Sequence, residues 1–249
     1  MPFRVNGNSK YIISLENNKV VKRSLNEDNR LLISARKQLN FKSSYFKTPK
    51  IYEYDNKHIE MEYIKGDSFY DFFIKASKRD LDEFIYKIEG YFNENVVGYY
   101  DLPIELIKNK IETFNNNERL LKAIKDIKSI KIKLGPCHGD FTLSNMIFSN
   151  DIYLIDFLDS YLESPTMDIL KLRQDTDLYW SFNMTKYIKD EVKLKIGLKY
   201  IDDWIKDRYK VEYYNLLQTI NLYRIINYTT NKNVLDYLEK NIDKLCQHL

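Results

Sequence analysis

Residues 137–157 of the chain read CHGDFTLSNMIFSNDIYLIDF. Two short apolar runs on either side of the polar turn at 149–151 predict a tight β-hairpin. Asp140 and Asn145 stand at the two ends of the loop that precedes the hairpin, and Asp156 lies at its far end. A hairpin of this length returns the chain to its start, so the three side chains are expected to converge.

The three converging side chains all carry oxygen. Carboxylate and amide oxygens are hard ligands of the kind that Mg²⁺ prefers, and few are needed because the metal keeps waters and substrate phosphates in its shell. The stretch around Asp140, Asn145 and Asp156 therefore predicts a magnesium site with a base within reach.

The chain before residue 65 has the short alternating pattern of β-strands, with one helical interruption. The expected elements are strands at 10–15 and 19–25, a helix at 26–40, and strands at 49–52 and 59–64. The polar stretch Lys65-Gly66-Asp67 ends this pattern. We therefore expect residues 1–64 to form an N-terminal lobe.

Beyond residue 68 the apolar residues recur three or four positions apart, which is typical of long helices. Helices are expected at 68–76, 80–95, 103–114 and 117–128, from Pro165 onward, and over most of the chain after 185. Only the hairpin region interrupts them. The pattern predicts an α+β protein of two lobes, with residues 65–249 forming a mainly helical C-terminal lobe.

The composition is that of an ordinary globular protein. The 39 basic and 36 acidic residues leave a net charge of only +3, which gives no field that favours nucleic acid or an anionic membrane. The two cysteines have no metal or redox spacing, and no apolar run is long enough to span a membrane or direct export. We expect a cytoplasmic protein; the oligomeric state stays open.

The segments HGDFTLSN at 138–145 and IDF at 155–157 resemble the catalytic loop and metal-binding motif of the aminoglycoside phosphotransferase and choline kinase superfamily, which shares the protein-kinase fold. The resemblance implies a bilobal protein-kinase-like fold with ATP bound in the cleft between the lobes. It also implies that Asp140 is the catalytic base and that Asn145 and Asp156 coordinate Mg²⁺ at the ATP phosphates.

Two further residues take roles through the same resemblance. His138 is expected to brace the catalytic loop. Asp168 matches the structural aspartate that follows the metal motif in the family, and its expected job is to fix the loop by hydrogen bonds.

The resemblance continues through the first lobe. It implies that Lys22 meets the α- and β-phosphates of ATP and that the backbone of Glu62, Tyr63 and Ile64 meets the adenine edge. Residues 6–9 take the place of the phosphate-covering loop. For the helix glutamate that pairs with the lysine in this fold, the alignment gives Ser34, with Glu27 as an off-register substitute.

The acceptor is expected to be a hydroxyl of a small molecule: a sugar, an amino alcohol such as choline, or an aminoglycoside-like compound. A protein substrate is disfavoured because Thr142 stands where protein kinases carry a lysine and their glycine-rich loop is absent. An alternative is a catalytically silent pseudokinase that binds a nucleotide or a partner.

Two other groups of residues have a plainer interpretation beside a functional one. The aromatic residues Tyr179, Trp180 and Phe182, which follow Asp175 and Asp177, could frame a cationic or sugar substrate, but core packing is favoured. Cys137 is expected to be a small core residue and not a nucleophile.

Overall fold

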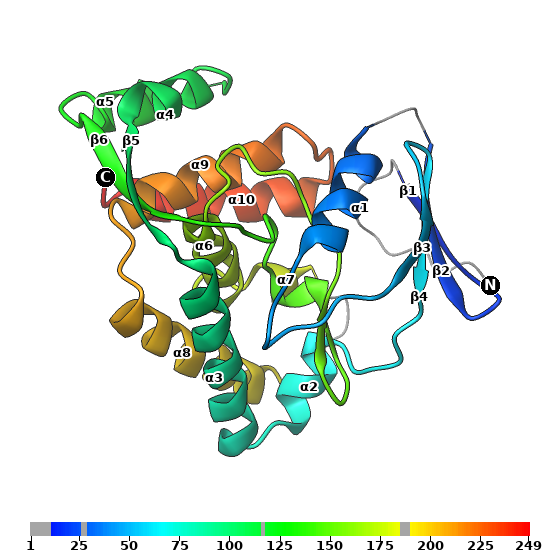
Figure 1. The fold of residues 1–249 in the computed structure, drawn as a ribbon. Coiled ribbons are helices and arrows are strands. Elements are labelled where there is room, and N and C mark those ends of the chain that lie inside the picture. The colour runs from blue at the N-terminus through cyan, green and yellow to red at the C-terminus, as the bar shows by residue number, and fades with distance from the viewer. Residues whose placement is uncertain (1–10, 26–28, 116–117, 185–189) are drawn as a thin grey trace.

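The structure, a computed structural model, describes residues 11–25, 29–115, 118–184 and 190–249. Figure 1 shows that the N-terminal part of the chain forms a small β-sheet, which lies beside a larger and mostly helical part. The predicted α+β class is confirmed. The placement of a lobe boundary after residue 64 stays a prediction.

The N-terminal sheet has four antiparallel strands in the order β1-β2-β4-β3. They are β1 (Tyr11–Glu16), β2 (Lys19–Ser24), β3 (Ile51–Tyr54) and β4 (His58–Glu62). Asn17 and Asn18 make the β1–β2 turn with φ angles of 48° and 62°, a left-handed backbone that asparagine tolerates. The turn residues therefore account for the predicted hairpin.

Helix α1 (Arg30–Asn40) covers one face of this sheet. Leu31 and Ala35 of the helix are buried in one apolar cluster with Ile59 and Met61 of β4. This cluster holds the helix against the strand that leads toward the rest of the molecule.

The rest of the chain is mainly helical. Its elements are α2 (Phe69–Lys75), α3 (Lys78–Asn95), β5 (Gly98–Pro103), α4 (Ile104–Ile111), α5 (Glu118–Ala123), β6 (Ser129–Leu134), η1 (Leu143–Asn145), β7 (Met146–Phe148), β8 (Ile152–Leu154), α6 (Pro165–Thr176), α7 (Trp180–Asn183), α8 (Glu191–Arg208), α9 (Tyr214–Ile226) and α10 (Lys232–Cys246). The β7–β8 hairpin is antiparallel, as expected from the central stretch.

One element differs from the sequence-based expectation. Strands β5 and β6 pair as an antiparallel ribbon (Figure 1), although no strand was expected between or directly after the helices at 80–95, 103–114 and 117–128. The two helices between the strands are also shorter than expected. Ile130 and Ile132 of β6 are buried while Ser129 and Lys131 are exposed, a period of two that is visible in the sequence. The partner strand lies some thirty residues earlier, so no local turn signal announced the pairing.

The β7–β8 hairpin is bonded to the two segments that flank the β3–β4 pair, one before β3 and one after β4. The Lys47 amide donates to the Ile152 carbonyl over 2.9 Å, and the Asp67 amide donates to the Phe148 carbonyl over 2.7 Å. A Cβ atom on Gly66 would lie 2.6 Å from the Phe148 carbonyl oxygen, so this close approach of two backbones requires glycine. These bonds fix the hairpin against the N-terminal part.

An aromatic layer lies beneath the hairpin and its preceding loop. The Tyr91 ring stacks on Phe141 with centroids 4.8 Å apart, and Phe46 meets both of these rings edge-on. All three side chains are buried. Phe141 directly follows Asp140, so the packing of its ring in this layer fixes the position of the loop that carries the predicted base.

Within the described residues, no helix combines the length and the apolar character needed to cross a membrane.

Candidate active site

The loop that carries Asp140 depends on glycine at position 139. Gly139 has a φ of 87°, and a Cβ atom there would collide with the carbonyl oxygen of Leu158. The Leu158 amide in turn donates to the His138 carbonyl over 3.2 Å. Glycine therefore allows the segment after Asp156 to lie directly against the loop.

Asp168, on the buried helix α6, holds this loop from below. One of its oxygens accepts from the His138 amide and the Tyr91 hydroxyl, both at 2.7 Å, and the other accepts from the Gly139 amide at 2.8 Å. Burial raises the pKa of Asp168 to about 6, although these three donors oppose the shift. The hydrogen bonds expected for this residue are present.

His138 is buried and connects the loop to the strand end that carries Asp156. Its Nε2 lies 2.9 Å from the Ile155 carbonyl, and its Nδ1 accepts from the Asp140 amide at 3.2 Å. Burial lowers the pKa of His138 to about 4, so at neutral pH the ring is neutral with its proton on Nε2. A neutral ring braces the loop without adding charge to the site.

Asp140 is held by two side chains. Asn145 Nδ2 donates to the Asp140 carbonyl and to its carboxylate Oδ2, both at 2.9 Å, while Lys171 Nζ lies 3.1 Å from Oδ1. Burial alone would raise the pKa of Asp140, but the charge and hydrogen bond of Lys171, together with His138 and Asn145, outweigh it and the pKa is lowered. The predicted base is therefore ionised at neutral pH.

Lys171 is a site residue that the sequence interpretation missed. It lies on α6 one turn after Asp168, and its side chain is only 9% exposed, which is unusual for a lysine. The segment PTMDILKLRQDT has charged residues on every face of an otherwise apolar helix, and all twelve residues are buried. Charged residues spread around a helix that must be buried are the signal that could have identified Lys171.

The Lys171→Met variant is expected to need a higher pH for activity. Without the cation, only the smaller effects of His138 and Asn145 oppose burial, so the pKa of Asp140 rises and the acid limb of the pH–rate profile moves to higher pH. We expect kcat at neutral pH to fall about tenfold. Lys171→Arg keeps the charge, so the acid limb of its pH–rate profile should lie at the wild-type pH. If the acid limb of Lys171→Met also stays at the wild-type pH, the cation does not act on Asp140.

Lys22 and Asp156 meet although 134 positions separate them. Lys22 Nζ on β2 lies 2.7 Å from Asp156 Oδ1, and the lysine side chain is only 12% exposed. Asp156 follows β8 with a φ of 59°, a left-handed backbone that turns its side chain out of the hairpin. The structure thus joins the two predicted phosphate- and metal-binding positions across the interface between sheet and helical part.

Helix α1 carries no acidic residue to pair with Lys22. Ser34, the aligned position, is buried, and Glu27 lies outside the described residues, as do residues 6–9. The helix instead presents Lys37, whose Nζ lies 2.8 Å from both carboxylate oxygens of Glu163 and from the Leu158 carbonyl. Helix α1 therefore contacts the segment after Asp156 through the Lys37 side chain.

The two predicted magnesium ligands, Asn145 and Asp156, suit a hard cation that takes only a few of its ligands from the protein. Both contacts of Asn145 use Nδ2, so within the described part of the chain its Oδ1 accepts no hydrogen bond. The Asn145 carbonyl accepts from the Ile155 amide at 3.0 Å, which holds the Asp156 segment beside it. Among the described residues no cluster of three His, Cys, Asp or Glu side chains forms a complete metal cage. One amide and one carboxylate agree with a cation that takes its remaining ligands from phosphate and water.

The expected adenine-contacting segment follows β4. The Glu62 amide donates to the Lys50 carbonyl at 2.8 Å and is thus already used. In the described residues, no backbone hydrogen bond engages Tyr63 or Ile64. Glu62 also lines a cavity of about 500 Å³ on the side of Phe46 and Tyr153.

The aromatic group near Asp175 belongs to the core. Phe182 is 4% exposed, and Trp180 packs edge-on against Tyr237 at 5.6 Å. Asp175 is buried and accepts from the backbone amides of Leu143 and Ser181 at 2.5 and 2.7 Å. It therefore supports the loop that carries Asp140, and the packing interpretation is confirmed for the aromatic residues.

Cys137 is also a core residue, as expected. It is 4% exposed, and burial raises the pKa of its thiol well above the ordinary value. A protonated, buried thiol is a poor nucleophile.

The arrangement of the N-terminal sheet, the loop that carries Asp140 and the β7–β8 hairpin can be compared with known proteins. Residues 91–183 match the model of the phosphotransferase enzyme family. No curated protein sequence matches the chain. The match covers the catalytic loop, the hairpin and α6.

Solved structures share the fold over nearly the whole chain. The ternary complex of APH(2'')-IIa with streptomycin and ATP is 20% identical and aligns over 99% of this chain and 91% of that one, with a TM-score of 0.53. A thermostable APH(4)-Ia variant with ADP and hygromycin B is 11% identical over 99% and 92%, with a TM-score of 0.62. A choline/ethanolamine kinase family protein from Mesorhizobium loti is 14% identical over 100% and 87%, with a TM-score of 0.50.

The solved structures confirm the bilobal protein-kinase-like fold, and the match over residues 91–183 agrees with the resemblance to the aminoglycoside phosphotransferase and choline kinase superfamily.

Proposed function

We propose that this protein transfers the γ-phosphoryl group of ATP to a hydroxyl of a small molecule. The observation that supports this most is the contact of Lys22 with Asp156, beside the pair of Asp140 and Asn145. Residues 140–156 supply two carboxylates and an amide, and Lys22 reaches one of these carboxylates from the N-terminal sheet, 134 positions away. The family match and the shared fold support the same class of reaction.

Each of these side chains has one role in the proposal. Asp140, ionised and held by Asn145 and Lys171, orients the acceptor hydroxyl and takes its proton. Lys22 exchanges its contact with Asp156 for the α- and β-phosphates. Asn145 Oδ1 and Asp156 would hold Mg²⁺, which supplies charge neutralisation at the phosphates.

Adenine recognition falls to Tyr63 and Ile64. Of the three predicted residues, Glu62 already donates its amide to Lys50, whereas the other two keep their backbone groups available in the described structure. A nucleobase edge needs such unpaired donors and acceptors.

The acceptor class remains broad in this proposal. The titles of the similar structures name streptomycin, hygromycin B and the choline/ethanolamine kinase family. We favour a sugar or an amino alcohol over an antibiotic, because no dense acidic patch suited to a polycation is visible in the sequence. The cytoplasmic location stays a prediction from the sequence.

An acceptor screen tests the proposal. The purified protein, ATP and Mg²⁺ are incubated with choline, ethanolamine, simple sugars, a fructosamine and aminoglycosides, and phosphorylated products are detected by mass spectrometry. We expect one acceptor class to be phosphorylated in a magnesium-dependent way. Omission of the acceptor gives the background of ATP hydrolysis.

A silent pseudokinase is the second candidate, and one observation favours it. Helix α1 has no acidic residue, so in the described structure Lys22 has Asp156 and not a helix glutamate as its partner. Calorimetric binding of ATP without a phosphorylated product from any acceptor would favour this alternative over the enzyme.

A further inference from the structure

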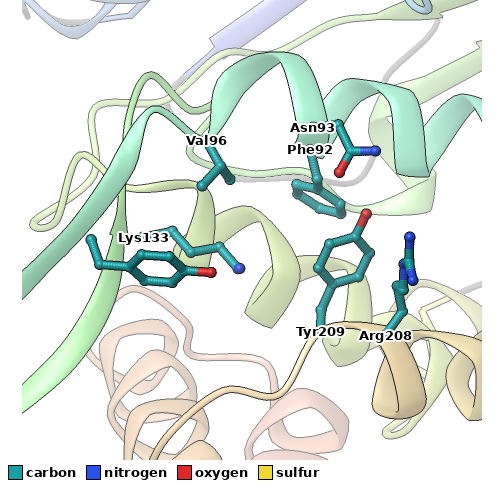
Figure 2. Close-up of a pocket in the computed structure, with 7 residues that line it drawn as sticks. Phe92, Asn93, Val96, Lys133, Arg208 and Tyr209 are labelled. Atoms are coloured by element: carbon teal, nitrogen blue, oxygen red, sulfur yellow. The ribbon is translucent and has the colours of Figure 1, made fainter.

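A second cavity lies on the helical part, away from the candidate active site. It has a volume of about 320 Å³ and lies between the C-terminal end of α3, strands β5 and β6, and the C-terminal end of α8. Figure 2 shows the Tyr209 ring between the side chains of Lys133 and Arg208, with Phe92 and Asn93 above. None of the residues proposed to bind ATP, magnesium or the acceptor lines it.

Lys133 brings an uncompensated positive charge to the wall of this cavity. Its Nζ lies 5.1 Å from the ring centroid of Tyr99 and 5.5 Å from that of Tyr209. In the described part of the chain no carboxylate pairs with it. Two aromatic faces orient the ammonium group without neutralising its charge.

The other polar groups of the lining are also hydrogen-bond donors or neutral. Arg208 uses Nη2 for an ion pair with Glu89 at 2.7 Å, and the two side chains are 59% and 29% exposed, so water screens the pair. Burial raises the pKa of Tyr209 to about 12, so its hydroxyl keeps its proton. Asn93 adds an amide, and the lining contains no acidic side chain.

The ring faces set the shape of what fits. Phe92, Tyr99 and Tyr209 form apolar walls around the cations, and Phe92 meets the Tyr209 ring at 5.1 Å. A volume near the lower end of ligand pockets suits one ring and one charged group.

We infer that this cavity is a binding site for a small aromatic phosphate monoester. The phosphate pairs with the Lys133 ammonium group, whose charge no described carboxylate offsets, and the ring of the ligand packs against the aromatic walls of the cavity. This site is separate from the proposed active site and does not depend on phosphoryl transfer.

Isothermal titration calorimetry with phenyl phosphate tests the inference, with phenol and inorganic phosphate as reference probes. Phenyl phosphate should bind more tightly than either reference probe, because only it offers both charge and ring. Lys133→Met should weaken binding about tenfold or more. Lys131→Met is the matched control, since Lys131 lies over the same Tyr99 ring at 5.0 Å but does not line the cavity.

The Lys22→Met variant separates this cavity from the active site. Binding that survives in Lys22→Met and is lost in Lys133→Met supports the inference, provided that thermal melting shows both variants folded. The opposite pattern, equal losses in Lys131→Met and Lys133→Met, or no binding of phenyl phosphate to the wild-type protein would overturn it.

Discussion

The Asp140→Asn variant is expected to lose turnover by about 10²–10⁴-fold, the contribution of a well-placed general base. Asparagine has the same shape and can still accept from Asn145 Nδ2, but it cannot take a proton from the acceptor. Nucleotide binding should be kept, because Lys22 and the segment after β4 are untouched. The measurement is kcat with the acceptor found in the screen.

Asp151→Asn is the matched control for this variant. Asp151 lies on the β7–β8 turn, and its exposed carboxylate pairs with Lys47 on the surface. This variant should keep wild-type turnover. Because Asp140→Asn leaves the buried Lys171 without its partner charge, circular dichroism must establish that the variant is folded. A folded Asp140→Asn protein with full activity would refute the assignment of the base.

The Asp168→Asn variant is expected to lower the free energy of unfolding by about 3 kcal/mol or more. The carboxylate accepts from three donors on both of its oxygens, and an amide must turn its NH₂ group toward at least one of them. The NH₂ group of the asparagine then faces another buried hydrogen-bond donor, and neither group has an acceptor. Denaturant unfolding measures the loss, and Tyr91→Phe, which removes only one of the three bonds, should cost clearly less.

The same variant should change how stability depends on pH. The folded pKa of Asp168, about 6, is raised above the ordinary value of 3.8 by burial. Its proton-linked stabilisation is therefore complete below pH 3.8 and is lost as the pH rises through about 6. Asp168→Asn should remove this part of the slope, while Asp175, with a pKa also raised to about 6, keeps its own part. An unchanged slope would contradict the assigned pKa.

Local patterns were sufficient to predict much of the fold. The Asn17–Asn18 turn lies between two alternating runs and the turn at 149–151 lies between two apolar runs, so both hairpins follow from neighbouring residues. The β5–β6 ribbon does not, because its strands pair across an intervening pair of short helices. The alternation of buried Ile130 and Ile132 with exposed residues indicates a strand at β6, but it does not indicate that β5 is the strand that pairs with it.

In the candidate site too, contacts within one loop follow from the sequence, whereas contacts between distant elements do not. Asp140 and Asn145 lie five positions apart, and their contact follows from one short loop. The contacts of Lys171 with Asp140 and of Lys37 with Glu163 join elements 31 and 126 positions apart. No pattern of neighbouring residues encodes such pairs, so only the packing of α6 and α1 reveals them. The resemblance pointed to Lys22, and the fold supplied its neighbour Asp156.

A crystal structure with AMP-PNP and Mn²⁺ shows, by the anomalous signal of manganese, whether Asn145 and Asp156 hold the metal of the nucleotide. We expect a manganese peak held by Asn145 Oδ1 and the Asp156 carboxylate, with Lys22 moved from Asp156 to the nucleotide phosphates. A nucleotide bound elsewhere, or a manganese peak away from these two side chains, would contradict it.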